Sequence, residues 1–479
     1  MIREVIVEIL NTLGYYRKKG RTLSATRDYV ETNKYKKDLS YTPNFHLTAP
    51  IGWLNDPNGF IFFQGKYHLF YQYNPYDTHW GPMYWGHSVS EDLITWTDLP
   101  VAMAPDSKAD KGGVWSGSAI EKDGKLFVIY SGNIHKGQVQ NIAYSEDGIN
   151  FTKYEGNPVI SGKQLPSFAS TINFRDPKIW QVNGIYYAVI ASKVVGKPAI
   201  LLYRSKDIYS FEYLSTLIVF EDIYMRECPD YFTLGDKKVL LMSSKSGDST
   251  VIIGHEENNQ LIAESEDDLD YGLDFYAPQT TEVGGRRIMT AWMHNWNEKV
   301  LTGKYGYAGM MIIPREITLV DGKIWIEPVK ELDSYRSDKI CYNNIIINEE
   351  NPTELEGICG SAIDMIIGAE LNDNNCIFVE LMKTNDESIT IYIDNENISL
   401  DRVNIENRKG RQSLSICYDL PLSYKFKKAR IVLDKYTVEV FSEGKTLSMT
   451  AFPEGKDYKI TFESDYKTII NIEKYNLRR

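Results

Sequence analysis

Short hydrophobic runs alternate with turn residues along most of the chain and recur at a regular interval. Five of these runs begin just after a turn glycine, at Gly65, Gly124, Gly184, Gly235 and Gly285. The glycines are 59, 60, 51 and 50 residues apart, and each lies between two extended runs, as in a β-hairpin. A period of this length in strands, with no helical pattern, predicts the blades of a β-propeller.

A second marker recurs in phase with the first. It consists of a Ser-x-Asp tripeptide and an aromatic residue six positions after the serine. The three copies are Ser90-x-Asp92 with Trp96, Ser145-x-Asp147 with Phe151, and Ser205-x-Asp207 with Phe211. Because two independent markers keep the same phase, the sequence predicts five blades over residues 44–328.

The pattern changes after residue 328. Hydrophobic runs continue with polar connections but without the long period, and residues 434–441 alternate as a half-buried strand does. We therefore expect an all-β chain: a five-bladed β-propeller, a linker over residues 329–336 and a β-sandwich over residues 337–479.

Residues 1–43 precede the first repeat and are expected to form a helical extension. Apolar residues recur at helical spacing from Ile2 to Leu13. This helix or the sandwich domain is a candidate surface for a homo-oligomer, although packing on the flank of the propeller explains the spacing equally well.

Charge and composition narrow the range of partners. A net charge of −12 argues against a nucleic-acid partner, because such proteins usually carry a basic patch. No apolar run is long enough to span a bilayer, so no membrane partner is expected. Arg3, Glu4 and Glu8 interrupt the apolar N-terminus, which argues against a signal peptide. The sequence predicts a cytoplasmic protein.

Neither a disulfide framework nor a metal site is indicated. The five cysteines are scattered and show no C-x-x-C pair or zinc-ligand spacing. The histidines have no H-E-x-x-H spacing, and the acidic stretch over residues 256–274 does not fit an EF-hand loop. We therefore expect no metal.

Three carboxylates occupy one repeated position. Asp56, Asp176 and Glu227 each lie eight or nine residues before the turn glycine that follows. In a propeller the innermost strands run along the central axis, so equivalent positions form a ring around it. We expect the three acids to meet at one end of the axial channel, with Ser116 and Tyr276–Pro278 completing the ring.

Each motif also has a structural explanation when it is taken alone. The sequence from Asp56 to Gly59 is a favourable turn, which the aspartate can cap. Asp176 beside Arg175 can form an ion pair, and a lone Glu227 is weak evidence. The common phase of the three acids makes the functional interpretation the stronger one.

Converging carboxylates suit the cleavage of a glycosidic bond, which needs one protonated acid and one ionised carboxylate. Glu227 is flanked by apolar residues, namely Met225, Cys228, Pro229 and Phe232. An apolar setting raises the pKa of a carboxyl group, so Glu227 is the candidate acid/base. Asp176, held ionised by Arg175, suits a group that anchors sugar hydroxyls and stabilises positive charge. Asp56 is then left as the nucleophile.

These motifs resemble those of glycoside hydrolase family 32, which contains invertases, fructanases and sucrose-6-phosphate hydrolases. The matching segments, in the expected order, are 53–59, 115–119, 174–177, 227–230 and 270–279. The resemblance implies a five-bladed propeller followed by a β-sandwich, a retaining mechanism through a covalent fructosyl-enzyme, and no cofactor. It places the nucleophile on Asp56, the transition-state stabiliser on Asp176 and the acid/base on Glu227.

The resemblance also implies a set of fructose-binding residues: Asn55, Gln72, Trp80, Trp115, Ser116, Arg175 and Trp292. Two positions depart from the common pattern. Trp115 stands where many relatives carry Phe or Tyr, which would reshape the pocket beyond the fructose. Leu54 replaces a common Met, with little expected effect.

The expected activity is hydrolysis of the terminal β-D-fructofuranoside of sucrose and of short fructooligosaccharides. Sucrose-6-phosphate hydrolase is the closest alternative, and a phosphate would need a nearby cation such as Lys136, Lys193, Arg226 or Lys245. An exo-fructanase or a fructosyltransferase would use the same triad. A non-catalytic sugar-binding protein needs no nucleophile, and an arabinan- or xylan-cleaving propeller does not explain the Asp56 and Glu227 motifs together.

Overall fold

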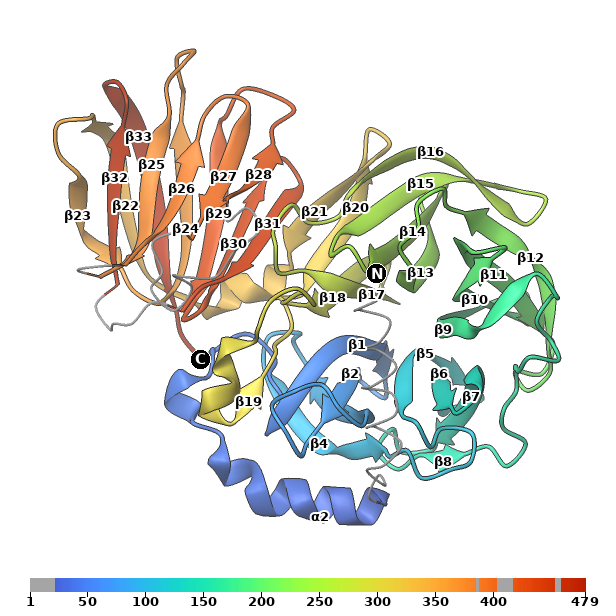
Figure 1. Cartoon of the computed structure of the whole chain (residues 1–479). Helices are drawn as coiled ribbons and strands as arrows, with labels where there is room; N and C mark the ends of the chain where they lie inside the picture. Colours follow the sequence, from blue (N-terminus) through green and yellow to red (C-terminus); the bar gives the residue numbers. More distant parts are fainter. Residues whose placement is uncertain (1–21, 385–386, 403–416, 453–457) are drawn as a thin grey trace.

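The computed structural model describes residues 22–384, 387–402, 417–452 and 458–479. A ring of small sheets forms one half of the molecule and two larger stacked sheets form the other (Figure 1). The fold class expected from the sequence, a five-bladed β-propeller followed by a β-sandwich, is confirmed. The helix expected between Ile2 and Leu13 lies outside the described residues.

Each blade of the propeller is an antiparallel sheet of four strands. Blade one contains β1 (Gly52–Phe63), β2 (Lys66–Asn74), β3 (Tyr84–Ser90) and β4 (Trp96–Met103). Blade two contains β5 (Val114–Lys122), β6 (Lys125–Ile134), β7 (Gly137–Ser145) and β8 (Thr152–Lys153). Blade three contains β9 (Ala169–Val182), β10 (Ile185–Val194), β11 (Lys197–Ser205) and β12 (Phe211–Val219).

The last two blades follow the same plan. Blade four contains β13 (Arg226–Leu234), β14 (Lys237–Ser244), β15 (Ser249–Glu257) and β16 (Gln260–Asp268). Blade five contains β17 (Tyr276–Val283), β18 (Arg286–Trp292), β20 (Arg315–Val320) and β21 (Lys323–Pro328). A long connection between β18 and β20 carries the short helix η3 (Leu301–Tyr305) and β19 (Tyr307–Ala308), which pairs with β1 in parallel and extends the first blade.

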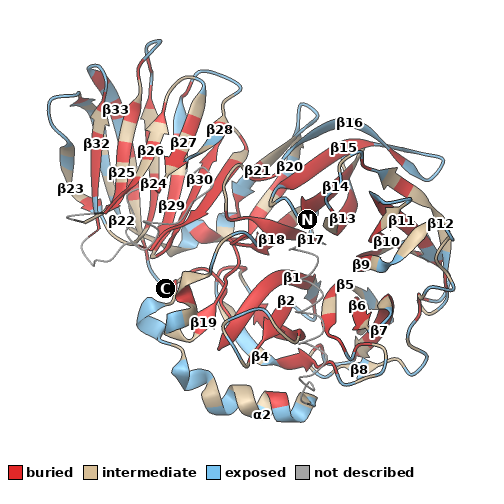
Figure 2. Ribbon diagram, in the orientation of Figure 1, coloured by how far each residue is buried: buried red, intermediate tan, exposed pale blue. Residues whose placement is uncertain are grey.

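The first strand of every blade faces the axis, and these five strands close a ring. β1 contacts β5, β5 contacts β9, β9 contacts β13, β13 contacts β17, and β17 contacts β1. Buried residues run along the first three strands of most blades, and the outermost strands are more exposed (Figure 2). Each inner strand is therefore flanked by two others around the axis.

Both repeats seen in the sequence serve the blade hairpins. The five turn glycines join the first and second strands of their blades, and all have φ between +62° and +82°. Glycine adopts this left-handed region without the steric cost that a side chain carries. The Ser-x-Asp marker joins the third and fourth strands of blades one to three. In blade one, Asp92 Oδ1 accepts hydrogen bonds from the Ser90 hydroxyl and from the backbone N–H of Thr95.

The sandwich consists of two six-stranded antiparallel sheets. The first contains β22 (Arg336–Ile347), β33 (Thr468–Leu477), β24 (Ala362–Ala369), β29 (Lys428–Asp434), β30 (Thr437–Ser442) and β31 (Lys445–Thr450). The second contains β23 (Thr353–Cys359), β32 (Lys459–Ser464), β25 (Ile377–Lys383), β26 (Ile389–Ile393), β27 (Asn397–Asp401) and β28 (Cys417–Pro421). Isoleucine, leucine, valine and methionine side chains fill the space between them.

Short helical segments precede the propeller and join it to the sandwich. The helix α2 (Leu23–Asn33) packs beside blade one, where Arg27 Nε donates to the Val101 carbonyl at 2.8 Å. The 3-10 turns η1 (Lys34–Lys36) and η2 (Leu39–Tyr41) lead into the propeller, and η4 (Lys330–Tyr335) joins it to the sandwich. Among the described residues, no helix is long and apolar enough to cross a bilayer.

Candidate active site

All five inner strands are bulged at the same level of the axial channel. Pairing with the second strand of the blade is interrupted at residues 54–57 in β1, 114–117 in β5, 175–178 in β9, 227–230 in β13 and 276–279 in β17. A bulge removes a residue from the ladder and redirects its side chain. Proline, which cannot donate a ladder hydrogen bond, stands in four of these bulges. The three expected acids lie at this level.

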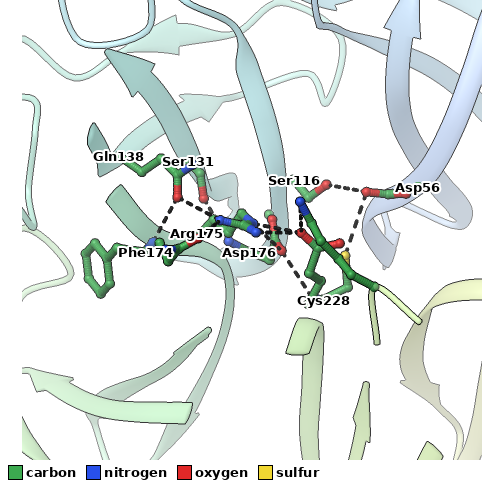
Figure 3. Close-up of polar contacts among 12 residues, drawn as sticks. Asp56, Ser116, Ser131, Gln138, Phe174, Arg175, Asp176 and Cys228 are labelled. Atoms are coloured by element: carbon green, nitrogen blue, oxygen red, sulfur yellow. Dashed lines mark hydrogen bonds and ion pairs between the residues drawn. The ribbon is translucent and has the colours of Figure 1, made fainter. Parts of the chain in front are cut away.

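Asp56 on β1 has one engaged oxygen and one without a partner. Its Oδ2 accepts a hydrogen bond from the Ser116 hydroxyl at 3.0 Å, and Cys228 Sγ lies 3.7 Å from the same oxygen (Figure 3). Its Oδ1 is buried and receives no hydrogen bond from the described residues. Burial and the charge of Glu227 raise the pKa of Asp56 to about 6.

Asp176 on β9 is held by its own backbone conformation. Its φ of +63° is rare for a residue with a side chain, and its backbone N–H donates to the Ser131 hydroxyl at 2.8 Å. The backbone N–H of Cys228 donates to Asp176 Oδ2 at 3.2 Å. Strain of this kind persists only where surrounding contacts enforce it, and it is common in active sites.

Glu227 on β13 accepts three hydrogen bonds. Arg175 donates to its Oε1 from Nε at 2.9 Å and from Nη2 at 2.7 Å, and the Tyr276 hydroxyl donates to its Oε2 at 2.6 Å. Lys245 Nζ lies 3.9 Å from Oε1. These contacts bring residues of blades three, four and five together around one carboxyl group.

The pKa shifts of two of the acids are the reverse of those expected from the sequence. Burial disfavours ionisation of Glu227, but Lys245, Arg175 and Tyr276 outweigh it and lower its pKa. Burial, with the charges of Glu227 and Asp56, raises the pKa of Asp176 to about 7 although Arg175 opposes the shift. The expectation of an apolar Glu227 and an ionised Asp176 was wrong because Arg175 turns toward Glu227, while its Nε lies 3.9 Å from Asp176 Oδ2.

The residues expected to bind fructose divide into four buried polar residues and three tryptophans. Asn55, Gln72, Ser116 and Arg175 are buried around the acids. Trp115 has a buried indole N–H without a partner in the described part of the chain, so it can donate to a ligand. Trp80 is 37% exposed. Trp292 has no exposed surface and packs edge-on against Trp53 and Tyr276, so a direct contact of Trp292 with substrate stays a prediction.

Three supporting residues were missed by the sequence analysis. Gln138 Oε1 accepts hydrogen bonds from the Phe174 N–H at 2.8 Å and from Arg175 Nη1 at 3.3 Å, and Asn173 Oδ1 accepts from the same nitrogen at 3.3 Å. With Ser131, they hold the Arg175–Asp176 segment (Figure 3). Ser131 and Gln138 lie on β6 and β7, outside the repeated position, so no sequence signal marked them.

A second polar layer lies along the inner strands beyond the acids. Lys178 Nζ donates to Asp230 Oδ2 and to the Thr280 carbonyl, both at 2.8 Å, and joins blades three, four and five. Gln279 Nε2 donates to the Gly117 carbonyl at 2.7 Å and joins blades five and two. These buried contacts hold the inner strands in fixed relation, which positions the acids. No cluster of three metal-ligating side chains occurs in the part of the chain that the structure describes.

Comparison with known proteins assigns the family. The family model "Glycosyl hydrolases family 32 N-terminal domain" matches residues 46–328, and the C-terminal model of the same family matches residues 331–477. The chain belongs to glycosyl hydrolase family 32. As a member of that family it is a glycoside hydrolase.

Relatives within family 32 match over most of their length. A sucrose-6-phosphate hydrolase of Zymomonas mobilis is 35% identical over 437 residues, which cover 83% of each chain. A sucrose-6-phosphate hydrolase of Escherichia coli is 32% identical and covers 93% of this chain and 96% of its own. The solved structure of a Bombyx mori β-fructofuranosidase has a TM-score of 0.82 and 30% identity, and covers 95% of this chain and 98% of its own.

Proposed function

We propose that this protein is a retaining β-fructofuranosidase that hydrolyses the terminal fructosyl unit of sucrose and of short fructooligosaccharides. The observation that carries the proposal is the meeting of Asp56, Asp176 and Glu227 from three blades at one bulged level. Membership of family 32 and the sucrose-cleaving relatives support it.

Asp56 is the proposed nucleophile. Ser116 holds its Oδ2 and leaves Oδ1 without a hydrogen bond from the described residues. Oδ1 forms a bond to the anomeric carbon of the fructosyl unit as the bond from that carbon to the glycosidic oxygen breaks. The electron pair of the broken bond goes to the leaving oxygen, which takes a proton from Glu227. The oxygen of a water molecule then bonds to the anomeric carbon as the bond from that carbon to Asp56 Oδ1 breaks, and Glu227 takes a proton from the water, which releases fructose and restores the Asp56 carboxylate.

These steps need a proton on Glu227, whereas Lys245, Arg175 and Tyr276 lower its pKa and favour its ionised form. The raised pKa of Asp176 leaves a proton within the same cluster. We infer that sugar hydroxyls draw Arg175 from Glu227 toward Asp176. That movement lowers the pKa of Asp176, raises that of Glu227 and transfers the proton to the acid that needs it.

The test compares kcat/KM for sucrose, sucrose-6-phosphate and 1-kestose in the wild type and in Asp56→Ala. Fructose release that Asp56→Ala abolishes is the expected result. Glu227→Gln should lower kcat by about 10²–10⁴ on natural substrates, because it removes the general acid. Fructose release that survives Asp56→Ala would disprove the assigned nucleophile, and no release from any of the three sugars would disprove the activity.

One observation favours sucrose-6-phosphate as the preferred substrate. The leaving sugar lies on the side of the acid/base, and Lys245 Nζ is 3.9 Å from Glu227 on a turn with a side chain 43% exposed. Of the other three cations considered, two have partners and Lys136 lies on the exposed turn between β6 and β7. Arg226 is paired with Asp222, and Lys193 Nζ donates to the Ile223 carbonyl at 3.2 Å.

Lys245→Met should therefore reduce kcat/KM for sucrose-6-phosphate about tenfold more than kcat/KM for sucrose, the size of one charge-assisted contact, because the loss of its effect on the pKa of Glu227 is common to both sugars. Lys193→Met is the matched control and should change neither value. Equal losses on both sugars from Lys245→Met would show that the lysine acts on Glu227 and does not select phosphate. Cytoplasmic location and homo-oligomerisation stay predictions.

A further inference from the structure

Three residues with positive φ occupy one equivalent position of the inner strands. Asp176, Cys228 and Ala277 each directly precede the proline of their bulge, and their φ values are +63°, +53° and +53°. A bulge leaves the backbone N–H of such a residue outside the ladder of its own blade, and a buried N–H needs a partner elsewhere. The partners of these three N–H groups are not of one kind.

Two of the N–H groups are held by a serine of the preceding blade. The Asp176 N–H donates to the Ser131 hydroxyl at 2.8 Å, and the Ala277 N–H donates to the Ser243 hydroxyl at 2.8 Å. Both serines are buried and lie on the second strand of their blade, β6 and β14 respectively. In blades two and four, a hydroxyl on the second strand therefore serves the bulge of the next blade.

The equivalent position in blade three is Ala191 on β10. Ala191 pairs with Arg175, the second residue before the bulge proline, and Ser243 pairs with Glu227, which stands at the same place in blade four. Ser131 likewise lies opposite the bulge of β5. The methyl group of alanine accepts no hydrogen bond, so the N–H in the next blade needs another acceptor.

The neighbour of this position on the third strand differs in the same way. The two serines hydrogen-bond to Gln140 and Ser249 on the third strands of their blades, at 2.9 and 2.7 Å. Ala191 instead pairs with Ile200 on β11. Blade three therefore has an apolar pair where blades two and four have a polar one.

The N–H that lacks a serine partner donates to an acid of the candidate site. The Cys228 N–H donates to Asp176 Oδ2 at 3.2 Å, and Cys228 Sγ lies 3.7 Å from Asp56 Oδ2. A hydrogen bond to an ionised carboxylate is stronger than one to a neutral hydroxyl. This N–H therefore restricts the orientation of the Asp176 carboxyl group beside the proposed nucleophile.

We propose that Ala191 is a positioning residue: because it offers no hydroxyl acceptor, the Cys228 N–H stays with Asp176 and orients the transition-state stabiliser. Ala191 acts through Cys228 and touches no substrate, and the inference rests on the proposed fructofuranosidase activity. Packing alone also accounts for a buried alanine, since Ala191 lies in an apolar cluster with Met225 and Leu240. The two explanations predict different results for Ala191→Ser.

Ala191→Ser places a hydroxyl where blades two and four carry one. The hydroxyl should take the Cys228 N–H from Asp176 and lower kcat for sucrose about tenfold, the size of one hydrogen bond to a charged group. Ala188→Ser is the matched control, because Ala188 is equally buried on the same strand but lies outside the bulge. The control should leave kcat unchanged.

The pH profile separates this role from a packing defect. The hydrogen bond favours the ionised form of Asp176, so its loss should raise the pKa of Asp176. The alkaline limb of kcat/KM, which depends on the proton that Asp176 supplies, should then move to higher pH. The titratable groups that face Asp176 are Arg175 on the same strand, Glu227 and Cys228 on β13, and Asp56 on β1; none of them changes in Ala191→Ser. A lower kcat with an unmoved alkaline limb, or no change in either, would overturn the proposal.

Two further measurements keep the test independent of folding and of turnover. Ala191→Ser combined with Ile200→Thr gives the new hydroxyl a polar neighbour, as in blades two and four, and should show the same two changes if melting shows the single variant to be unstable. Carbon NMR titration of isotope-labelled aspartate, assigned with Asp176→Asn, measures the pKa of Asp176 directly. If the wild type releases no fructose, the proposed activity fails, while a raised pKa in Ala191→Ser still supports the role of Ala191. An unchanged pKa refutes it.

Discussion

Arg175 sets the electrostatics of the site at the scale of single residues. It gives two hydrogen bonds to Glu227 and stands 3.9 Å from Asp176, so it decides which of the two carboxyl groups keeps a proton. Gln138 and Asn173 hold the other end of its guanidinium group. In the proposed mechanism, a small rotation of this side chain couples substrate binding to the placement of the proton.

This arrangement predicts a narrow bell-shaped pH profile of kcat/KM, which reports the free enzyme. The acidic limb should lie near pH 6, because Asp56, the proposed nucleophile, must be ionised and its pKa is raised to about 6. The alkaline limb should lie near pH 7, where the cluster loses the proton held on Asp176. Initial rates on sucrose between pH 4 and pH 10 test this, and an alkaline limb above pH 8 would contradict the proton source.

At the scale of elements, the in-phase bulges convert five ordinary strands into a site. Backbone conformations with positive φ follow from them at Asp176, Cys228 and Ala277, at +63°, +53° and +53°. The backbone behind the bulge of β5 is closely packed, so Gly117 has no room for a larger residue. A Cβ at Gly117 would lie 2.1 Å from the Ile129 carbonyl oxygen on the neighbouring strand.

Gly117→Ala should therefore destabilise the protein by about 3 kcal/mol or more, because the clash is with backbone, and should lower kcat by displacing the adjacent Ser116. Gly184→Ala is the matched control: its φ is +80° but no atom lies within 4 Å of the added Cβ. That variant should lose only about 1 kcal/mol to backbone strain and keep its activity. Denaturant unfolding measures the free energy of unfolding of both variants, and equal losses of stability would contradict the packing argument.

At the scale of the whole molecule, buried charges hold the two domains together. Arg315 of the propeller donates to Glu439 of the sandwich at 2.6 Å and to Asp270 at 2.7 Å. His46 lies between Asp434 and Glu439, with each ring nitrogen 2.9 Å from a carboxylate oxygen. Both nitrogens of a histidine donate only in the imidazolium form, so this contact requires a protonated His46.

Stability should therefore fall at alkaline pH. Burial lowers the pKa of His46, but Asp434 and Glu439 outweigh it and raise the pKa to about 9 from an ordinary value of 6.5. The contribution is complete below pH 6.5 and is lost as pH rises through 9; it amounts to roughly 3 kcal/mol. His46→Gln should lower Tm at pH 7 and flatten its decline toward pH 9.

The exposed pair of His255 and Glu264 provides the control for this prediction. His255→Gln should leave both Tm and its pH dependence unchanged, since an exposed ion pair contributes little. A steep alkaline decline that persists in His46→Gln would assign the effect to other groups. Melting curves at pH 6, 7, 8 and 9 decide between these outcomes.

The sequence by itself determined the fold class and the meeting of the three acids. Turn glycines and Ser-x-Asp turns are local requirements of backbone geometry, so they appear in the sequence at the period of the blades. Because blades repeat around an axis, equal phase meant nearness in space for Asp56, Asp176 and Glu227. Residues on second and third strands, such as Ser131 and Gln138, do not stand at the repeated position, so the sequence pattern could not identify them.

Only the tertiary structure decided which carboxyl group keeps the proton. Because Arg175 is adjacent to Asp176 in sequence, an ion pair between them was expected, yet its side chain hydrogen-bonds to Glu227 on the next blade. A cavity lined by Tyr41, Trp296 and Tyr436 likewise brings together residues that lie far apart in the chain. Such contacts depend on how packed sheets orient side chains across domains, and that information is absent from local sequence patterns.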